Sequence, residues 1–270
     1  MGADNFSSVL ESVLSALFLA VSIYVYAALV RKVQARATEP PLPTASVYGW
    51  PEATVAILLC LWFLLNIVFS ATHQVTTLQT PELVLNALFP IGLFLVIAGF
   101  LWLRGFDVGA LGGFSRMGFG RTLATGGLLL LAAYPLVLLA EVITQKIGGG
   151  SFEKQEIIEV FNASSTIRQR ILIIVLAVSI APMTEEFFFR FFLYGVAKRY
   201  FGRSVGVLAN SILFAAVHLH LPSFGPLFIL GVCLTIAYEW SGSIIVSMTM
   251  HALFNTLAMI ALAFPEVFPQ

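Results

Sequence analysis

The sequence predicts an all-α integral membrane protein, a polytopic bundle of about eight transmembrane helices. Of its 270 residues, 59% are hydrophobic and 10% are charged, whereas about 25% of the residues of a soluble domain are charged. Its apolar residues form runs close to the length of about 20 residues that a membrane-spanning helix requires. The formal net charge is zero, so the composition gives no reason to expect a nucleic-acid partner.

Eight apolar runs carry this prediction. They lie at 13–30, 55–71, 83–103, 122–142, 171–197, 204–218, 227–238 and 244–264. The first run is longer than a signal-peptide core and ends in Arg31-Lys32, so we expect a true membrane span. Between the runs, 104–121 is expected to form a loop or a short surface helix. The proline-containing stretch 221–226 is expected to turn the chain.

We divide the chain into three parts. Residues 1–145 hold four N-terminal spans, 146–170 form an extramembrane loop, and 171–264 form a C-terminal membrane core. The loop contains Gly148-Gly149-Gly150 and then an amphipathic stretch at 151–161. This stretch is expected to be a helix on the membrane surface or a lid.

Basic residues are distributed unevenly between the two sides of the predicted bundle. The loops after the first, third and fifth spans hold nine of them: Arg31, Lys32, Arg36, Arg104, Arg116, Arg121, Lys198, Arg199 and Arg203. The opposite side holds four: Lys146, Lys154, Arg168 and Arg170. Cytoplasmic loops carry an excess of Lys and Arg, so we expect the first group in the cytoplasm and both termini outside.

The fifth run contains the stretch Ala181-Pro-Met-Thr-Glu-Glu-Phe-Phe-Phe-Arg190. Ionisable residues at membrane depth are costly and are functional candidates by default. In a helix, Glu186 and Arg190 are i,i+4 neighbours on one face, and Glu185 lies about 100° away. We therefore expect Glu186 to pair with Arg190 and Glu185 to exchange protons. The alternative is a structural ion-pair cluster that orients a buried helix.

Two further spans carry polar side chains of catalytic type. Phe214-Ala-Ala-Val-His218 ends the sixth span, and His251-Ala-Leu-Phe-Asn255 lies within the eighth. A helix rise of about 1.5 Å per residue places these side chains at depths similar to that of Glu185. We therefore expect them to meet in one cavity. Taken singly, each His or Asn could be an interhelical hydrogen-bond partner, and Phe214 could pack beneath His218.

Together these motifs resemble the CPBP intramembrane protease family. The resemblance rests on Glu-Glu-x-x-x-Arg at 185–190, Phe-x-x-x-His at 214–218 and His-x-x-x-Asn at 251–255, with no departure at a motif position. That family includes the Ras-converting type of CAAX prenyl protease and bacterial relatives also called the Abi family. The resemblance covers 171–262 and implies an intramembrane endopeptidase whose CPBP-type catalytic core is 171–264. It also implies membrane protein or lipidated, CAAX-type peptide substrates, and leads us to expect a bacterial cytoplasmic membrane.

These residue types allow peptide hydrolysis. Glu185 would be the general base, and His218 would orient the water or pass its proton onward. His251 and Asn255 would donate hydrogen bonds to the oxyanion. Glu186, Arg190 and Phe214 would support the site. The resemblance likewise implies the first glutamate and the first histidine as the activating pair.

A metal is the main alternative within this chemistry. His218, His251 and either Glu185 or Glu186 could bind zinc with one position open for water. We favour no cofactor, because the sequence has no His-Glu-x-x-His and the histidines come from separate helices. Serine and cysteine mechanisms are disfavoured, since there is no Gly-x-Ser-x-Gly and neither cysteine lies within a motif.

Two other functions remain as alternatives. One is a non-proteolytic membrane scaffold, immunity or regulatory protein that retains the fold, although intact motifs argue against it. The other is a proton-coupled transporter, since buried Glu and His also form proton relays. A transporter predicts broken helices repeated in two halves, whereas the polar groups here cluster in the C-terminal half.

Overall fold

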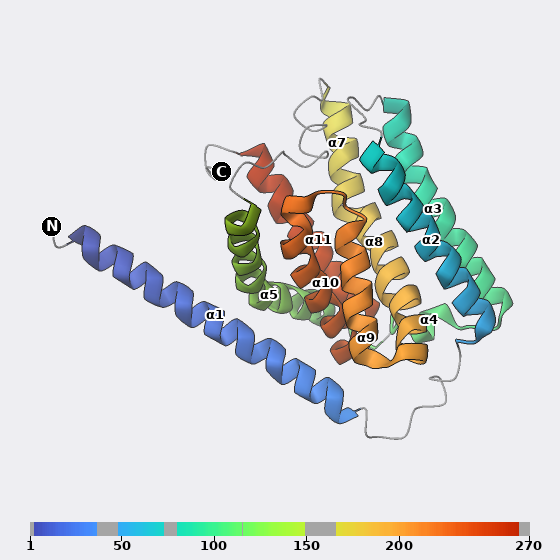
Figure 1. The fold of residues 1–270 in the computed structure, drawn as a ribbon, viewed down its shortest axis with the longest axis horizontal. Coiled ribbons are helices and arrows are strands. Elements are labelled where there is room, and N and C mark those ends of the chain that lie inside the picture. Colours follow the sequence, from blue (N-terminus) through green and yellow to red (C-terminus); the bar gives the residue numbers. More distant parts are fainter. Residues whose placement is uncertain (1–2, 37–47, 73–79, 115, 149–165, 265–270) are drawn as a thin grey trace.

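The computed structural model describes residues 3–36, 48–72, 80–114, 116–148 and 166–264. Every element in these ranges is a helix, which confirms the all-α prediction. The helices pack side by side as a bundle, and the first helix lies along one side and reaches beyond the others (Figure 1).

The helices fall into two groups along the chain. The first group is α1 (Ala3–Ala35), α2 (Trp50–Thr72), α3 (Thr80–Leu103), α4 (Val108–Leu111) and α5 (Phe119–Gly148). The second begins with one helical segment in which α-helical and π-helical (η) turns alternate. Its parts are α7 (Ile167–Val175), η3 (Leu176–Ile180), α8 (Ala181–Glu186), η4 (Phe187–Leu193) and α9 (Tyr194–Ala216). The last two helices are α10 (Leu221–Ser241) and α11 (Ile244–Ala263).

Among the described residues, six helical segments are long and apolar enough to cross a membrane. The longest, Ile167–Ala216, has 50 residues. It turns at Gly202, whose φ of 81° and ψ of 169° are not helical, so it supplies two passes. The C-terminal part of α3, Leu88–Leu103, is a shorter apolar helix. With α3 and both passes of the long segment included, the described residues hold the eight apolar segments that the sequence predicts.

The predicted turn at 221–226 is wrong, because Leu221 already begins α10. Pro222 lies in the first turn of this helix, where a backbone N–H has no partner within the helix. Pro226 is accommodated inside the helix. The chain turns earlier, between Ala216 and Leu221.

The prediction for 104–121 is confirmed by the short helix α4. The Asp107 side chain caps this helix by accepting a hydrogen bond from the backbone N–H of Ala110. The amphipathic stretch predicted at 151–161 lies outside the described residues, as does most of the predicted loop.

The centre of the bundle is α10, which contacts α1, α5, α9 and α11. The phenylalanine run of η4 packs into the same core, and each of its five rings is at most 4% exposed. Phe187 stacks edge-on against Phe94 of α3, and Phe189 stacks on Phe63 of α2. These contacts fix the rotation of the segment that carries Glu185 and Glu186.

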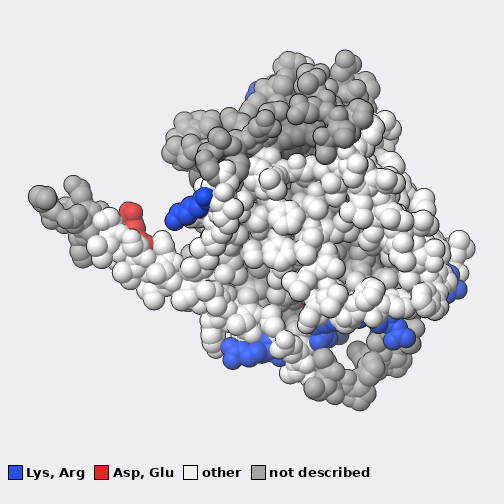
Figure 2. All heavy atoms as spheres, in the orientation of Figure 1, with Lys and Arg blue, Asp and Glu red and all other residues white. Residues whose placement is uncertain are grey.

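Lys and Arg side chains gather at one end of the bundle, which we call the basic end (Figure 2). Here α1 and α10 finish and α9 bends. Arg36 donates to the Trp240 carbonyl, while Arg203 donates to the Val33 carbonyl and to Glu239. Loops that the sequence assigns to one side therefore lie together. The cytoplasmic location of this end stays a prediction.

Replacing Gly202 with Ala is expected to lower thermal stability. No atom lies within 4 Å of a Cβ added at this position, so the change measures backbone strain alone, about 1–3 kcal/mol. Gly120→Ala is the matched control, since its Cβ also meets open space and its helical conformation favours Ala by about 0.5–1 kcal/mol. Thermal unfolding in detergent gives both values. A Gly202→Ala variant as stable as the wild type would contradict the strain.

Candidate active site

The two glutamates lie in α8, a short α-helical stretch between the π-helical turns η3 and η4. Such turns are rare and occur frequently at functional sites. Pro182 lies in the first turn of α8, and the Thr184 hydroxyl donates to the Ile180 carbonyl. α8 packs against α3 and α11. The directions in which the Glu185 and Glu186 side chains point are therefore set by a short α-helical segment with a π-helical turn at each end.

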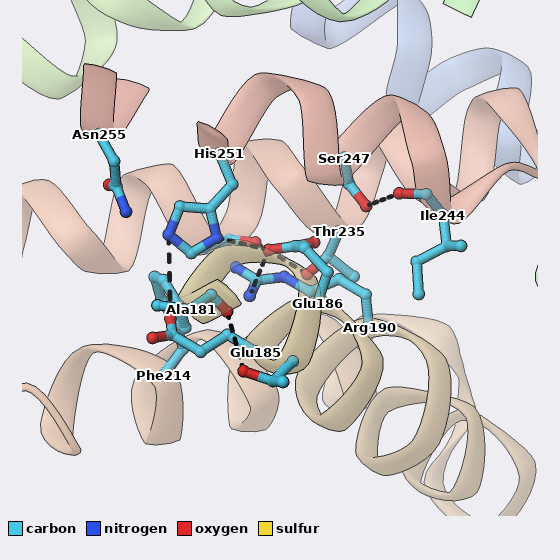
Figure 3. A network of polar contacts seen from close by, with 12 residues as sticks. Ala181, Glu185, Glu186, Arg190, Phe214, Thr235, Ile244, Ser247, His251 and Asn255 are labelled. Atoms are coloured by element: carbon cyan, nitrogen blue, oxygen red, sulfur yellow. Dashed lines mark hydrogen bonds and ion pairs between the residues drawn. The ribbon is translucent and has the colours of Figure 1, made fainter. Parts of the chain in front are cut away.

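Glu186 joins Arg190 and His251 through a single carboxylate oxygen. Arg190 Nη1 lies 3.0 Å from Glu186 Oε1, and His251 Nδ1 lies 2.9 Å from the same atom. The side chains of Glu186 and Arg190 are fully buried, and His251 is 3% exposed. The predicted pairing of Glu186 with Arg190 is present, and it extends to a histidine from another helix (Figure 3).

Glu185 faces both histidines. Its Oε2 lies 3.9 Å from His218 Nε2 and 3.8 Å from His251 Nε2. These gaps are too long for direct hydrogen bonds and short enough for one water molecule to bridge them. Side chains from three motifs on three helical segments therefore meet, as the matching depths predict. We call Glu185, His218 and His251 the cluster. The Glu185 and His218 side chains are 26% and 29% exposed, so they form its accessible side.

The hydrogen bonds of the histidines assign their ring protons. His218 Nδ1 lies 2.7 Å from the Phe214 carbonyl, which can only accept, so Nδ1 donates. His251 Nδ1 likewise donates to the Glu186 carboxylate. In neutral rings, both Nε2 atoms then present lone pairs toward Glu185. Three acceptor atoms thus surround one small volume, which suits a molecule with two donor hydrogens, such as water.

The ring of Phe214 packs against both histidines of the cluster. Its ring centroid lies 4.8 Å from that of His218 and 5.7 Å from that of His251. The Arg190 guanidinium carbon is 4.1 Å from the centroid of the Phe214 ring. This cation–π contact stabilises the buried positive charge of Arg190. The predicted packing of Phe214 beneath His218 is therefore present, and it includes the arginine.

Asn255 lies one turn beyond His251 on α11 and has a different neighbour. Its Nδ2 donates a hydrogen bond of 2.7 Å to the Ala177 carbonyl in η3. The other three predicted catalytic side chains face one another, whereas this amide binds the backbone beside them. Its predicted bond to an oxyanion stays a prediction.

Within the described ranges, no group of three His, Cys, Asp or Glu side chains has a spacing that could hold a metal ion. Ligand atoms in a tetrahedral zinc site with bonds of about 2.0–2.1 Å lie about 3.4 Å apart. Glu185 Oε2 is farther than this from both histidine nitrogens.

Sequence reasoning missed the buried polar residues that border the cluster. Ser247 lies one turn before His251, is fully buried, and donates to the Ile244 carbonyl. Asn210 Nδ2 donates to the Thr235 hydroxyl at 3.4 Å, between α9 and α10. The available signal was the i,i+4 spacing of Ser247 to His251 and of Asn210 to Phe214.

Comparison with known proteins gives one family. A family model described as type II CAAX prenyl endopeptidase Rce1-like matches residues 167–257. The matched segment contains all three motifs, and residues 1–166 lie outside it. No curated protein and no solved structure gave a match.

Proposed function

We propose that this chain, whose residues 167–257 form an Rce1-like domain of the CPBP (CAAX protease) family, is an intramembrane endopeptidase. Its substrates would be membrane proteins or lipidated, CAAX-type peptides. The proposal includes a bacterial cytoplasmic membrane as its location. The basic end would face the cytoplasm and both termini the outside.

The observation that carries the proposal is that the Nε2 atoms of His218 and His251 both lie within 3.9 Å of Glu185 Oε2. A structural ion-pair cluster would need only Glu186 and Arg190. Glu185 Oε2 has no hydrogen-bond partner among the described residues, so no hydrogen bond of this oxygen holds the fold. A carboxylate oxygen without a hydrogen-bond partner, placed between two histidines, fits a group that accepts and donates protons.

The arrangement supports direct attack of water on a peptide carbonyl. As the water oxygen bonds to the carbonyl carbon, Glu185 accepts one of its protons. The tetrahedral intermediate then breaks at its carbon–nitrogen bond. The leaving amine takes the proton from Glu185, directly or through His218. The products are a carboxylic acid and an amine, and Glu185 returns to its ionised form.

The sequence predicts that His251 and Asn255 donate hydrogen bonds to the oxyanion. Because His251 Nδ1 donates to Glu186, the imidazole can donate from Nε2 only when both ring nitrogens are protonated. Asn255 has one amide hydrogen bound to Ala177 and a second that could reach a substrate. Glu186, Arg190 and Phe214 would keep the imidazole of His251 in place.

We propose a mechanism without a metal cofactor. Cleavage is therefore expected to be unchanged after treatment with a chelator and dialysis, because Glu185 can deprotonate the water without a Lewis acid. A zinc protease treated in the same buffer controls for complete chelation. Loss of cleavage that added zinc restores would instead place His218 and His251 in a metal shell.

The proposed function is tested with purified protein and a library of membrane-anchored peptide reporters. Wild-type protein is expected to cut at least one class of reporter near its membrane anchor. A second reading of the chain is a non-proteolytic scaffold, immunity or regulatory membrane protein. This reading takes precedence if the wild-type protein cuts no reporter and if Glu185→Gln leaves the cellular phenotype unchanged.

A further inference from the structure

The carbonyl of Ala177 has lost both backbone donors that its own helical segment could offer. In the π-helical turn η3, the N–H of Ala181 bonds to the carbonyl of Leu176, five residues back. Ala181 is therefore not the donor that an α-helix would provide for Ala177. The next N–H in the π-helical register belongs to Pro182, and proline has none. The carbonyl needs a partner from elsewhere in the chain.

Asn255 supplies this partner from α11. Its amide nitrogen donates to the Ala177 carbonyl at 2.7 Å, and α11 and η3 are in contact. An apolar cluster around Ile173 and Met259 closes the same interface on the side away from the glutamates. One turn earlier on α11, His251 binds Glu186 (Figure 3). The same region of α11 therefore holds the glutamate segment at two points, one on each side of Pro182.

We propose that Asn255 is a positioning residue that replaces the backbone donor missing at Pro182. Its hydrogen bond holds η3, and with it the start of α8, against α11. Without this bond, α8 can shift and Glu185 Oε2 moves relative to His218 and His251. The catalytic consequence rests on the proposed function, whereas the structural consequence does not.

A positioning role and an oxyanion role make different predictions, because only the first depends on residue 182. An oxyanion donor acts on the substrate whatever residue precedes the glutamates. A donor to Ala177 becomes dispensable once residue 182 has an N–H of its own. The pair Asn255 and Pro182 therefore separates the two roles.

The test is a double-mutant cycle of Asn255→Ala and Pro182→Ala in the full-length protein in detergent. Asn255→Ala is expected to lower Tm and to lower kcat for a cleaved reporter by at least about tenfold, with KM little changed. Pro182→Ala restores a backbone donor, so the double variant is expected to recover most of both losses. Thr256→Val is the matched control, because that hydroxyl donates to the Ala252 carbonyl within α11. It should change neither value.

Two outcomes would overturn the proposal. One is an Asn255→Ala variant that loses activity at an unchanged Tm. The other is a double variant that recovers neither Tm nor kcat, which is the result expected of an oxyanion donor. If Asn255→Ala yields no folded protein, recovery of folded protein by adding Pro182→Ala is the same test. The Tm comparison needs no substrate, so wild-type protein that cleaves nothing counts against the proposed function alone.

Discussion

Glu185→Gln is expected to lower the rate of peptide cleavage by about 10³-fold, within the range of about 10²–10⁴ that general bases contribute. Glutamine has the same size and can still accept a hydrogen bond from water, but its amide cannot take up the proton. Glu185 Oε2 has no hydrogen-bond partner among the described residues, so the substitution breaks no hydrogen bond of that oxygen. Initial rates of reporter cleavage, with Tm measured on the same sample, check both parts of this expectation.

Glu141→Gln is the matched control for this change. Glu141 is exposed on α5 and accepts a hydrogen bond from Gln145 of the same helix. The Glu141→Gln variant should cleave at the wild-type rate, since the charge that it removes lies outside the cluster. A Glu185→Gln variant that cleaves as fast as Glu141→Gln would exclude Glu185 as the base.

Arg190→Met is expected to lower the free energy of unfolding by about 3–5 kcal/mol, the usual effect of removing one partner of a buried ion pair. Both side chains of the pair are fully buried, so Glu186 would keep a buried charge without its counter-ion. Adding Glu186→Gln removes that charge. The double variant is therefore expected to be more stable than Arg190→Met alone, as thermal or denaturant unfolding in detergent would show.

Arg199→Met controls for the loss of a basic side chain as such. Arg199 is exposed near the bend of α9, and exposed substitutions usually change stability by no more than about 0.5 kcal/mol. If the double variant proved no more stable than Arg190→Met, the two buried charges would not be coupled. The ion pair would then not be what holds Glu186 toward His251.

Much of the fold could be predicted because membrane spans leave a strong local signal. Long apolar runs and basic loops were enough to place eight segments and to group the loops that meet at the basic end. The pairing of Glu186 with Arg190 follows from i,i+4 spacing, which survives in η4 although its turns are π-helical. The meeting of Glu185, His218 and His251 followed from depth alone, since helices in a bilayer share one axis direction.

The remaining features depend on contacts that a sequence pattern does not record. Proline and glycine at 221–226 are typical of a turn, yet proline is also favoured in the first turn of a helix. In the structure, this stretch is the start of α10. The π-helical turns around α8 have no compositional signal. The acceptor of Asn255 is a backbone carbonyl, which no side-chain motif reveals.

The central claim is that the cluster of Glu185, His218 and His251 hydrolyses peptide bonds with a water molecule that Glu185 activates. The most direct measurement is the mass of the reporter fragments formed by wild-type protein and by Glu185→Gln in ¹⁸O-labelled water. We expect wild-type protein to release a fragment whose new carboxyl terminus carries the heavy isotope, together with a fragment that has a free amine, and Glu185→Gln to release neither. Unlabelled fragments, or equal amounts of labelled fragments from both proteins, would contradict this account.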